Sequence, residues 1–185
     1  MHGMTRIKAP RIQGSAVQDL ISSWPNASRK MASILIHSYG MPHEATQTML
    51  IWHYNGPWKR TVLHREGVRH NVPHPHIDLL EQTVDAMIPT DKHDEIAAFD
   101  GSILLDKTRG EMTAFCENEH TNTLILNLAH EIAIEKKTIE QARDFMEKFE
   151  GPIHASWPNP YRDSLQFTPT ILPNNQDTMV TQQPD

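Results

Sequence analysis

The chain has 185 residues and a mass of 21.2 kDa, a size that suits one domain with flexible ends. Its formal charge of −6 disfavours nucleic acids and anionic membranes as partners, because such binding relies on clustered Lys and Arg. Cys116 is the single cysteine, which excludes an intrachain disulfide and a thiolate-rich zinc site within one chain.

Both ends of the chain have a composition unsuited to a hydrophobic core. Residues 1–22 lack a sustained hydrophobic period and are expected to form a flexible N-terminal arm. Residues 151–185 are rich in Pro, Asn and Gln and are expected to form an extended or disordered tail. The region between them, residues 23–150, is expected to be a single globular domain. No segment resembles a signal peptide or the roughly 20 apolar residues of a membrane span, so we expect a cytoplasmic protein.

The first elements of this domain are predicted to be a helix and a β-hairpin. Apolar residues recur at helical spacing over residues 28–39, with Asn26 or Ser28 as the expected N-cap and a glycine and a proline soon after the end. Residues 46–65 contain two runs of β-branched and aromatic residues separated by Asn-Gly-Pro-Trp at 55–58, a typical turn sequence. These two runs should pair as an antiparallel hairpin.

A helix, a second short helix and a second hairpin are predicted next. Apolar residues at helical spacing over 77–87, before Pro89, indicate the first of these helices. A short helix should follow over residues 91–99, with acidic residues near its start. Residues 102–116 resemble a hairpin in which Gly110 supplies the positive φ of a short turn.

Two further helices complete the predicted order of elements. The segment 119–136 is apolar on a surface much wider than one stripe, which indicates a central buried helix. Thr138 and Gln141 form the pattern of a capping box at the start of a last amphipathic helix. The sequence therefore predicts an α+β fold, in which an antiparallel sheet built from two β-hairpins packs against about five helices.

Histidines crowd one stretch of the chain, and imidazole is the commonest transition-metal ligand in proteins. Five of them fall between residues 53 and 76. The last three lie in a His-x-x-x-His-x-His pattern followed by an aspartate, which gives a candidate metal site made of His70, His74, His76 and Asp78. Three nitrogens and an oxygen suit zinc. The alternative interpretation is a proline-stiffened loop whose Asp78 and Glu81 complement the start of a helix.

A candidate binding surface lies at the first hairpin turn, where Trp58, Lys59 and Arg60 follow one another. Exposed aromatic and cationic side chains form recognition surfaces for protein partners or anionic ligands. The alternative is that Trp58 covers the edge of the sheet while the two cations keep that edge soluble. The exposure of Trp58 distinguishes the two interpretations.

These residues leave two functional hypotheses open. The first is a binding or accessory module that has no cofactor and acts through a protein partner. It is favoured because the sequence contains no complete set of catalytic residues. The wide apolar helices are also compatible with a homodimer. The second is a divalent-metal-dependent hydrolase that uses the histidine-rich loop, with Glu81 as the base that activates a metal-bound water.

Overall fold

The computed structural model describes residues 10–71, 74–150 and 159–170, apart from the side chains of residues 149 and 150. Six strands form one antiparallel sheet in the order β1-β2-β3-β4-β6-β5, and six α-helices accompany them in the described part of the chain. The predicted α+β class and the two hairpins are confirmed. The chain divides into two compact units, residues 1–82 with 115–119 and residues 83–114 with 120–185.

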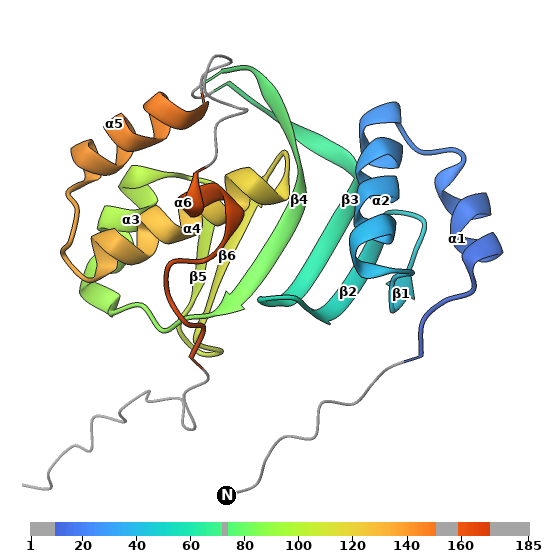
Figure 1. The fold of residues 1–185 in the computed structure, drawn as a ribbon, viewed down its shortest axis with the longest axis horizontal. Coiled ribbons are helices and arrows are strands. Elements are labelled where there is room, and N and C mark those ends of the chain that lie inside the picture. Colours follow the sequence, from blue (N-terminus) through green and yellow to red (C-terminus); the bar gives the residue numbers. More distant parts are fainter. Residues whose placement is uncertain (1–9, 72–73, 151–158, 171–185) are drawn as a thin grey trace, which may run out of the picture. The chain divides into compact units, whose positions relative to one another are not determined.

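The first unit contains two helices and the first strands of the sheet (Figure 1). Its elements are α1 (Gly14–Ile21), α2 (Asn26–Tyr39), β1 (Glu44–Ala45), β2 (Met49–Asn55), β3 (Trp58–His70) and most of β4 (His76–Asp85). Pro25, rather than Asn26 or Ser28, is the N-cap of α2, because its ψ of 151° is extended and Asn26 is the first helical residue. Helix α1 lies within the segment expected to be a flexible arm, and its Val17 is fully buried.

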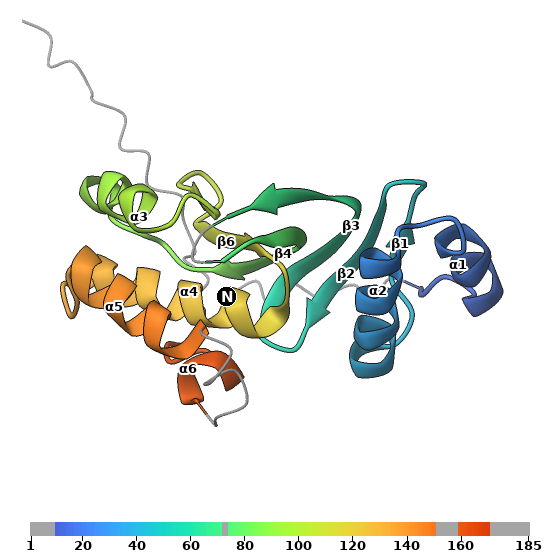
Figure 2. The same cartoon turned by 90° about the horizontal axis from the view of Figure 1, so that it is seen from above.

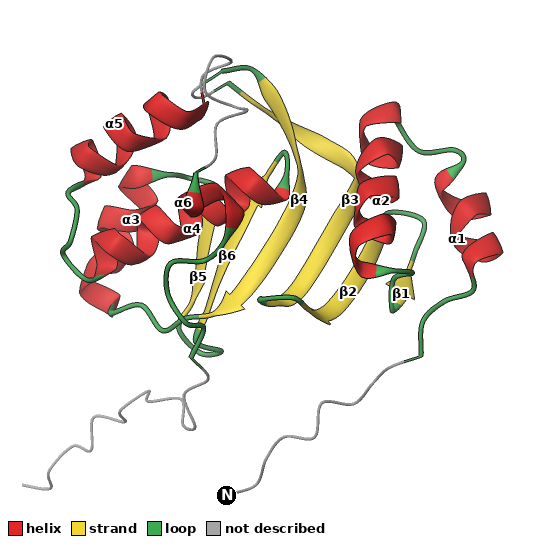
Figure 3. Ribbon diagram, viewed as in Figure 1, coloured by secondary structure: helices red, strands yellow, loops and turns green. Residues whose placement is uncertain are grey.

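The predicted first hairpin is formed by β2 and β3, which lie side by side in Figure 3. Leu50 pairs with Leu63 and Trp52 with Thr61 across the two strands. Gly56 has a φ of 64° in the turn, a conformation that glycine adopts without steric cost. Helix α2 packs on these strands. Leu35 of α2 forms one core cluster with Leu50, Trp52 and Leu63 of the hairpin and with Leu80 of β4.

The interpretation of residues 77–87 as a helix is wrong, because this segment forms strand β4. The apolar side chains of a half-buried strand alternate with polar ones, whereas a strand covered on both faces has a continuous apolar run. Strand β4 lies between β3 and β6, and both Leu79 and Leu80 are buried although they point to opposite faces. Because both faces of β4 are buried, apolar residues occur on both of them, and their helical spacing arises by chance.

The second unit contains the remaining strands and four helices (Figure 2). Its elements are the end of β4, the 3-10 turn Thr90–Lys92, α3 (His93–Phe99), β5 (Ile103–Asp106), β6 (Glu111–Cys116), α4 (Glu119–Ala133), α5 (Ile139–Glu150) and α6 (Pro160–Asp163). The last two residues of β6 and the first residue of α4 belong to the first unit. Strands β5 and β6 form the predicted second hairpin. Helix α4 is buried on nearly every side, as its wide apolar surface predicts.

The predicted capping box at the start of α5 is present. The backbone N–H of Thr138 donates to Gln141 Oε1 at 3.0 Å, and the N–H of Gln141 donates to Thr138 Oγ1 at 3.3 Å. Each bond satisfies a backbone donor that the first turn of a helix would otherwise leave without a partner. The predicted helix start is therefore confirmed.

Residues 159–170 are held against α4 by a buried amide. Asn127 Nδ2 donates to the carbonyl oxygens of Tyr161 and Ser164, both at 2.9 Å, and Asn127 Oδ1 accepts from the N–H of Gln166 at 2.7 Å. Figure 2 shows α6 beside α4, as these bonds require. Most of the expected tail, residues 151–158 and 171–185, lies outside the described residues. The prediction of a single domain over 23–150 stays a prediction.

A search of the described helices for membrane-spanning segments finds none of sufficient length and apolar character.

Candidate metal centre

The candidate ligands flank the connection between β3 and β4 in the first unit. His70 is the last residue of β3, His76 is the first residue of β4, and Asp78 follows two residues later. Residues two apart in a strand point to the same face, so His76 and Asp78 are neighbours by the geometry of β4. Their pairing with His70 comes from the adjacency of β3 and β4 in the sheet.

Asp78 is the centre of the group, with one imidazole beside each of its carboxylate oxygens. His76 Nε2 lies 3.0 Å from Asp78 Oδ1, and His70 Nδ1 lies 3.2 Å from Asp78 Oδ2. The Asp78 side chain is 6 % exposed and that of His76 is 7 % exposed. A carboxylate buried to this extent requires compensation by a proton, a cation or hydrogen bonds.

The ring of His76 is oriented by a backbone contact. Its Nδ1 lies 2.7 Å from the carbonyl oxygen of His74. A carbonyl oxygen can only accept a hydrogen bond, so the nitrogen that faces it must carry a proton. In the neutral ring this contact places the proton on Nδ1 and leaves the lone pair of Nε2 directed toward Asp78 Oδ1. Two lone pairs 3.0 Å apart repel unless a proton or a metal ion lies between them. This arrangement of ligand and supporting carbonyl is common around protein-bound metals.

His70 supplies a second nitrogen with unused bonding capacity. Its Nδ1 is buried and forms no hydrogen bond with any described residue, although Asp78 Oδ2 is near. Its ring centroid lies 4.9 Å from that of His76. One potential ligand atom from each of His70, His76 and Asp78 lies within 4.8 Å of the other two. Ligand atoms of a tetrahedral zinc ion are about 3.3 Å apart, given bonds of about 2.0 to 2.1 Å.

Gly67 allows the two strands to approach each other at this point. A Cβ atom on Gly67 would overlap Ile77 Cγ2 and would lie 2.7 Å from the backbone oxygen of Asp78. Because real side chains do not reach such distances, only glycine fits here without displacing β4. The position of Asp78 therefore depends on the absence of a side chain at residue 67.

Two other residues of the predicted site lie apart from these three. His74 is exposed, and its ring centroid is 5.4 Å from that of His76, so it is a neighbour of the group rather than a member. Glu81, the predicted base, instead contacts His64 Nε2 through Oε2 at 3.2 Å. This hydrogen bond lowers the pKa of Glu81. The structure thus brings together three of the four predicted ligands.

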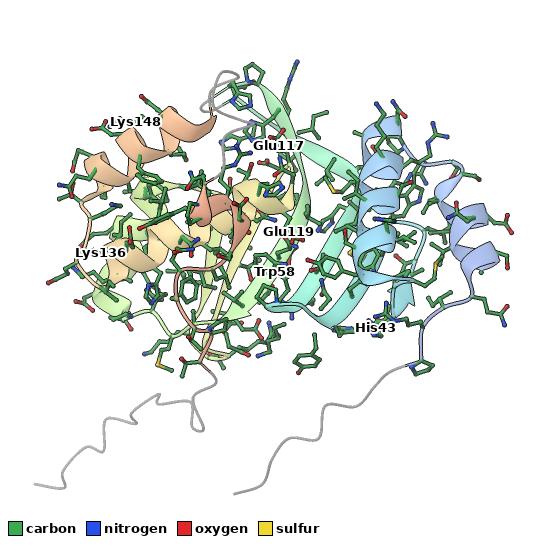
Figure 4. All side chains as sticks on the ribbon, in the orientation of Figure 1. His43, Trp58, Glu117, Glu119, Lys136 and Lys148 are labelled. Carbon is green, nitrogen blue, oxygen red and sulfur yellow. The ribbon has the colours of Figure 1, made fainter. Side chains whose placement is uncertain are left out.

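The predicted binding surface has no exposed aromatic ring. Trp58 (labelled in Figure 4) is 2 % exposed, while Lys59 and Arg60 are half-buried. The indole ring is therefore buried in the first unit, whereas the Lys59 and Arg60 side chains are partly exposed.

A partly buried polar network in the first unit was missed by the sequence interpretation. Tyr39 Oη donates to the carboxylate of Glu119 at 2.7 Å, and Gln82 Nε2 donates to the same carboxylate at 2.9 Å. Burial, followed by the Glu119 carboxylate, raises the pKa of Tyr39. The three residues come from α2, β4 and the start of α4, so no local pattern could have identified them.

A second pair of histidines lies near β1. The N–H of His53 donates to His43 Nδ1 at 3.0 Å, and His53 Nε2 lies 2.5 Å from Glu44 Oε1. Burial lowers the pKa of His43, which Figure 4 labels. These contacts engage His43 Nδ1 and His53 Nε2. Within the described ranges, only His70, His76 and Asp78 form a group of three converging metal-ligand side chains.

Comparison of the chain with protein-family models, with curated proteins and with solved structures gives no match.

Proposed function

We propose that this protein is a divalent-metal-binding domain in which His70, His76 and Asp78 hold one transition-metal ion. The observation that carries the proposal is the convergence of the three ligand atoms within 4.8 Å of one another. The orientation of His76 by the carbonyl of His74 supports it, because this contact prepares Nε2 to donate its lone pair.

Zinc is the ion that best fits these side chains. Two imidazole nitrogens and one carboxylate oxygen form a ligand set of borderline softness, which zinc shares with several catalytic sites. A site for Ca²⁺ or Mg²⁺ would be built from oxygen ligands instead.

Three protein ligands leave one position of a tetrahedral ion available to water or to a fourth side chain. A hydrolase would use that water and would need a base beside it. Glu81 is engaged with His64 and is not part of the converging group. We therefore propose metal binding rather than hydrolysis.

The experiment that tests this function is zinc titration of the untagged, chelator-treated protein by calorimetry, with metal content measured by mass spectrometry. The wild-type protein should bind one equivalent of zinc. His70→Ala and Asp78→Asn should each weaken binding by more than about 100-fold, because loss of an outer-shell partner alone costs 10- to 100-fold. The control is His37→Ala, since His37 is an exposed imidazole on α2 outside the group.

Two results would contradict the proposal. One is a folded wild-type protein that binds no stoichiometric zinc. The other is an Asp78→Asn protein that binds zinc as tightly as the His37→Ala control. Circular dichroism of each variant establishes that a loss of binding does not reflect unfolding.

A further inference from the structure

His74 lies beside the converging group, although its ring nitrogens are not part of it. Its side chain is exposed, and its ring centroid lies 5.4 Å from that of His76. The ring of His70, which does belong to the group, has its centroid 4.9 Å from the same ring. Two imidazoles bound to one tetrahedral ion have centroids roughly 5 Å apart, given metal–nitrogen bonds of about 2.0 to 2.1 Å. The ring of His74 therefore already has the separation from His76 that two ligands of one ion would have.

The backbone of His74 is held next to the group, whereas its side chain lies in solvent. His74 is in a bend two residues before His76, the first residue of β4. Its carbonyl oxygen faces His76 Nδ1 at 2.7 Å. Exposed side chains change rotamer within picoseconds to nanoseconds. Reorientation of the His74 ring therefore requires no change in the backbone contact that orients His76.

A metal ion held by three side chains gives this ring a reason to leave solvent. An imidazole that loses its hydration needs a partner that compensates for the loss. A bond from one of its nitrogens to a transition-metal ion is such a partner, and structural zinc sites are completed by four protein ligands. Because residue 74 is tethered beside the group, its ring has a high effective concentration there. The ring is thus favoured over a ligand that has to be captured from solution.

We propose that His74 is the fourth ligand of the metal ion and that its ring turns toward the ion when the ion binds. This role of His74 rests on the proposed function, because it concerns the same ion. An imidazole, rather than water, then takes the position that His70, His76 and Asp78 leave available. A closed site of this kind has no metal-bound water to activate. It contributes its binding free energy to the stability of the connection between β3 and β4.

The first test counts the imidazole rings that bind zinc, by NMR of the full chain labelled with nitrogen-15 in its histidines. One equivalent of zinc should move one ring nitrogen of three histidines to the chemical shift of a metal-bound nitrogen. In His74→Ala only two rings should respond. This variant keeps the carbonyl oxygen that orients His76, so it tests the ring alone. A wild-type protein that binds zinc through only two imidazoles would overturn the role of His74 and leave the proposed function standing.

The second test determines whether the bound ion has an open position. Cobalt(II) replaces zinc as a coloured probe, and azide changes its visible absorption where azide can displace a bound water. The cobalt-loaded wild-type protein should not respond to azide. Cobalt-loaded His74→Ala should respond, because water takes the place of the missing ring. A wild-type protein that responds to azide as strongly as this variant would contradict a closed site.

Zinc affinity provides a third measurement with a matched control. His74→Ala should weaken zinc binding by about 10- to 100-fold, less than the loss of His70 or Asp78, because ordering an exposed side chain offsets part of what its bond contributes. His37→Ala, which removes an exposed imidazole of α2, should leave the affinity and the azide response unchanged. Equal zinc affinity of the two variants would refute the role of His74 alone. A folded wild-type protein that binds no zinc would instead be the failure of the proposed function itself.

Discussion

Replacing Gly67 with alanine should destabilise the first unit and disturb the metal site together. The new methyl group would overlap Ile77 Cγ2 and would lie 2.7 Å from the backbone oxygen of Asp78. A side chain such as that of Ile77 can rotate away, but the backbone of β4 can only move as part of the sheet. The displaced residue is Asp78, the proposed central ligand, so zinc affinity should fall along with stability.

The expected loss of stability is about 1 to 2 kcal/mol. Overpacking a well-filled interior costs about 1 to 3 kcal/mol. Alanine also restricts the unfolded chain and returns about 0.4 to 1 kcal/mol. With a urea dependence of about 1 to 3 kcal/mol per molar, the unfolding midpoint should fall by about 1 M. Tryptophan fluorescence follows this unit well, because Trp24, Trp52 and Trp58 are all buried in it.

Gly101 offers a matched control for this substitution. A Cβ atom at Gly101 meets no atom within 4 Å, and its φ is not in the left-handed region. Gly101→Ala should therefore leave the midpoint unchanged or raise it slightly. A double variant, Gly67→Ala with Ile77→Ala, should recover only part of the loss, since the contact with the Asp78 oxygen persists. A Gly67→Ala protein as stable as Gly101→Ala would refute this account of the close approach.

Three further substitutions, one of them with a matched control, test the forces that hold the fold. Thr138→Ala removes one half of the capping box and should cost about 1 kcal/mol, measured by urea unfolding followed by helical circular dichroism. Leu80→Ala should cost about 2 to 5 kcal/mol because Leu80 is fully buried, whereas Leu104→Ala, at a side chain 61 % exposed, should cost less than about 0.5 kcal/mol. The hydrogen bond from His64 lowers the pKa of Glu81, so this carboxylate adds stability above its ordinary pKa of 4.5 and loses that contribution as the pH falls through the lowered value. Glu81→Gln should therefore make stability fall less steeply between neutral and acid pH in urea midpoints, and an unchanged acid dependence would exclude this contribution.

Local interactions made several elements predictable from the sequence. The capping box at Thr138 depends on residues three positions apart, and the turn at Gly56 requires a backbone conformation that few other residues adopt. Both hairpins followed from such turns and from the β-branched runs beside them. In each case the chemistry that determines the structure lies within one short segment.

Strand β4 could not be identified in this way, because its environment comes from other parts of the chain. Its apolar residues reflect cover on two faces, and the strands on either side are β3 and β6. The same is true of Trp58, whose position beside a polar turn suggests exposure although the ring is buried. Neither burial is encoded by the neighbouring residues alone.

The metal group shows the same division within a single site. The sequence alone determined that imidazoles and a carboxylate crowd one short stretch of the chain. The structure shows that the strand geometry of β4 makes His76 and Asp78 neighbours. Only the tertiary structure decided that His70 joins them while His74 stays exposed. The physical reason is that spacing along the chain sets which residues are able to meet, whereas strand pairing and burial set which of their atoms face one another.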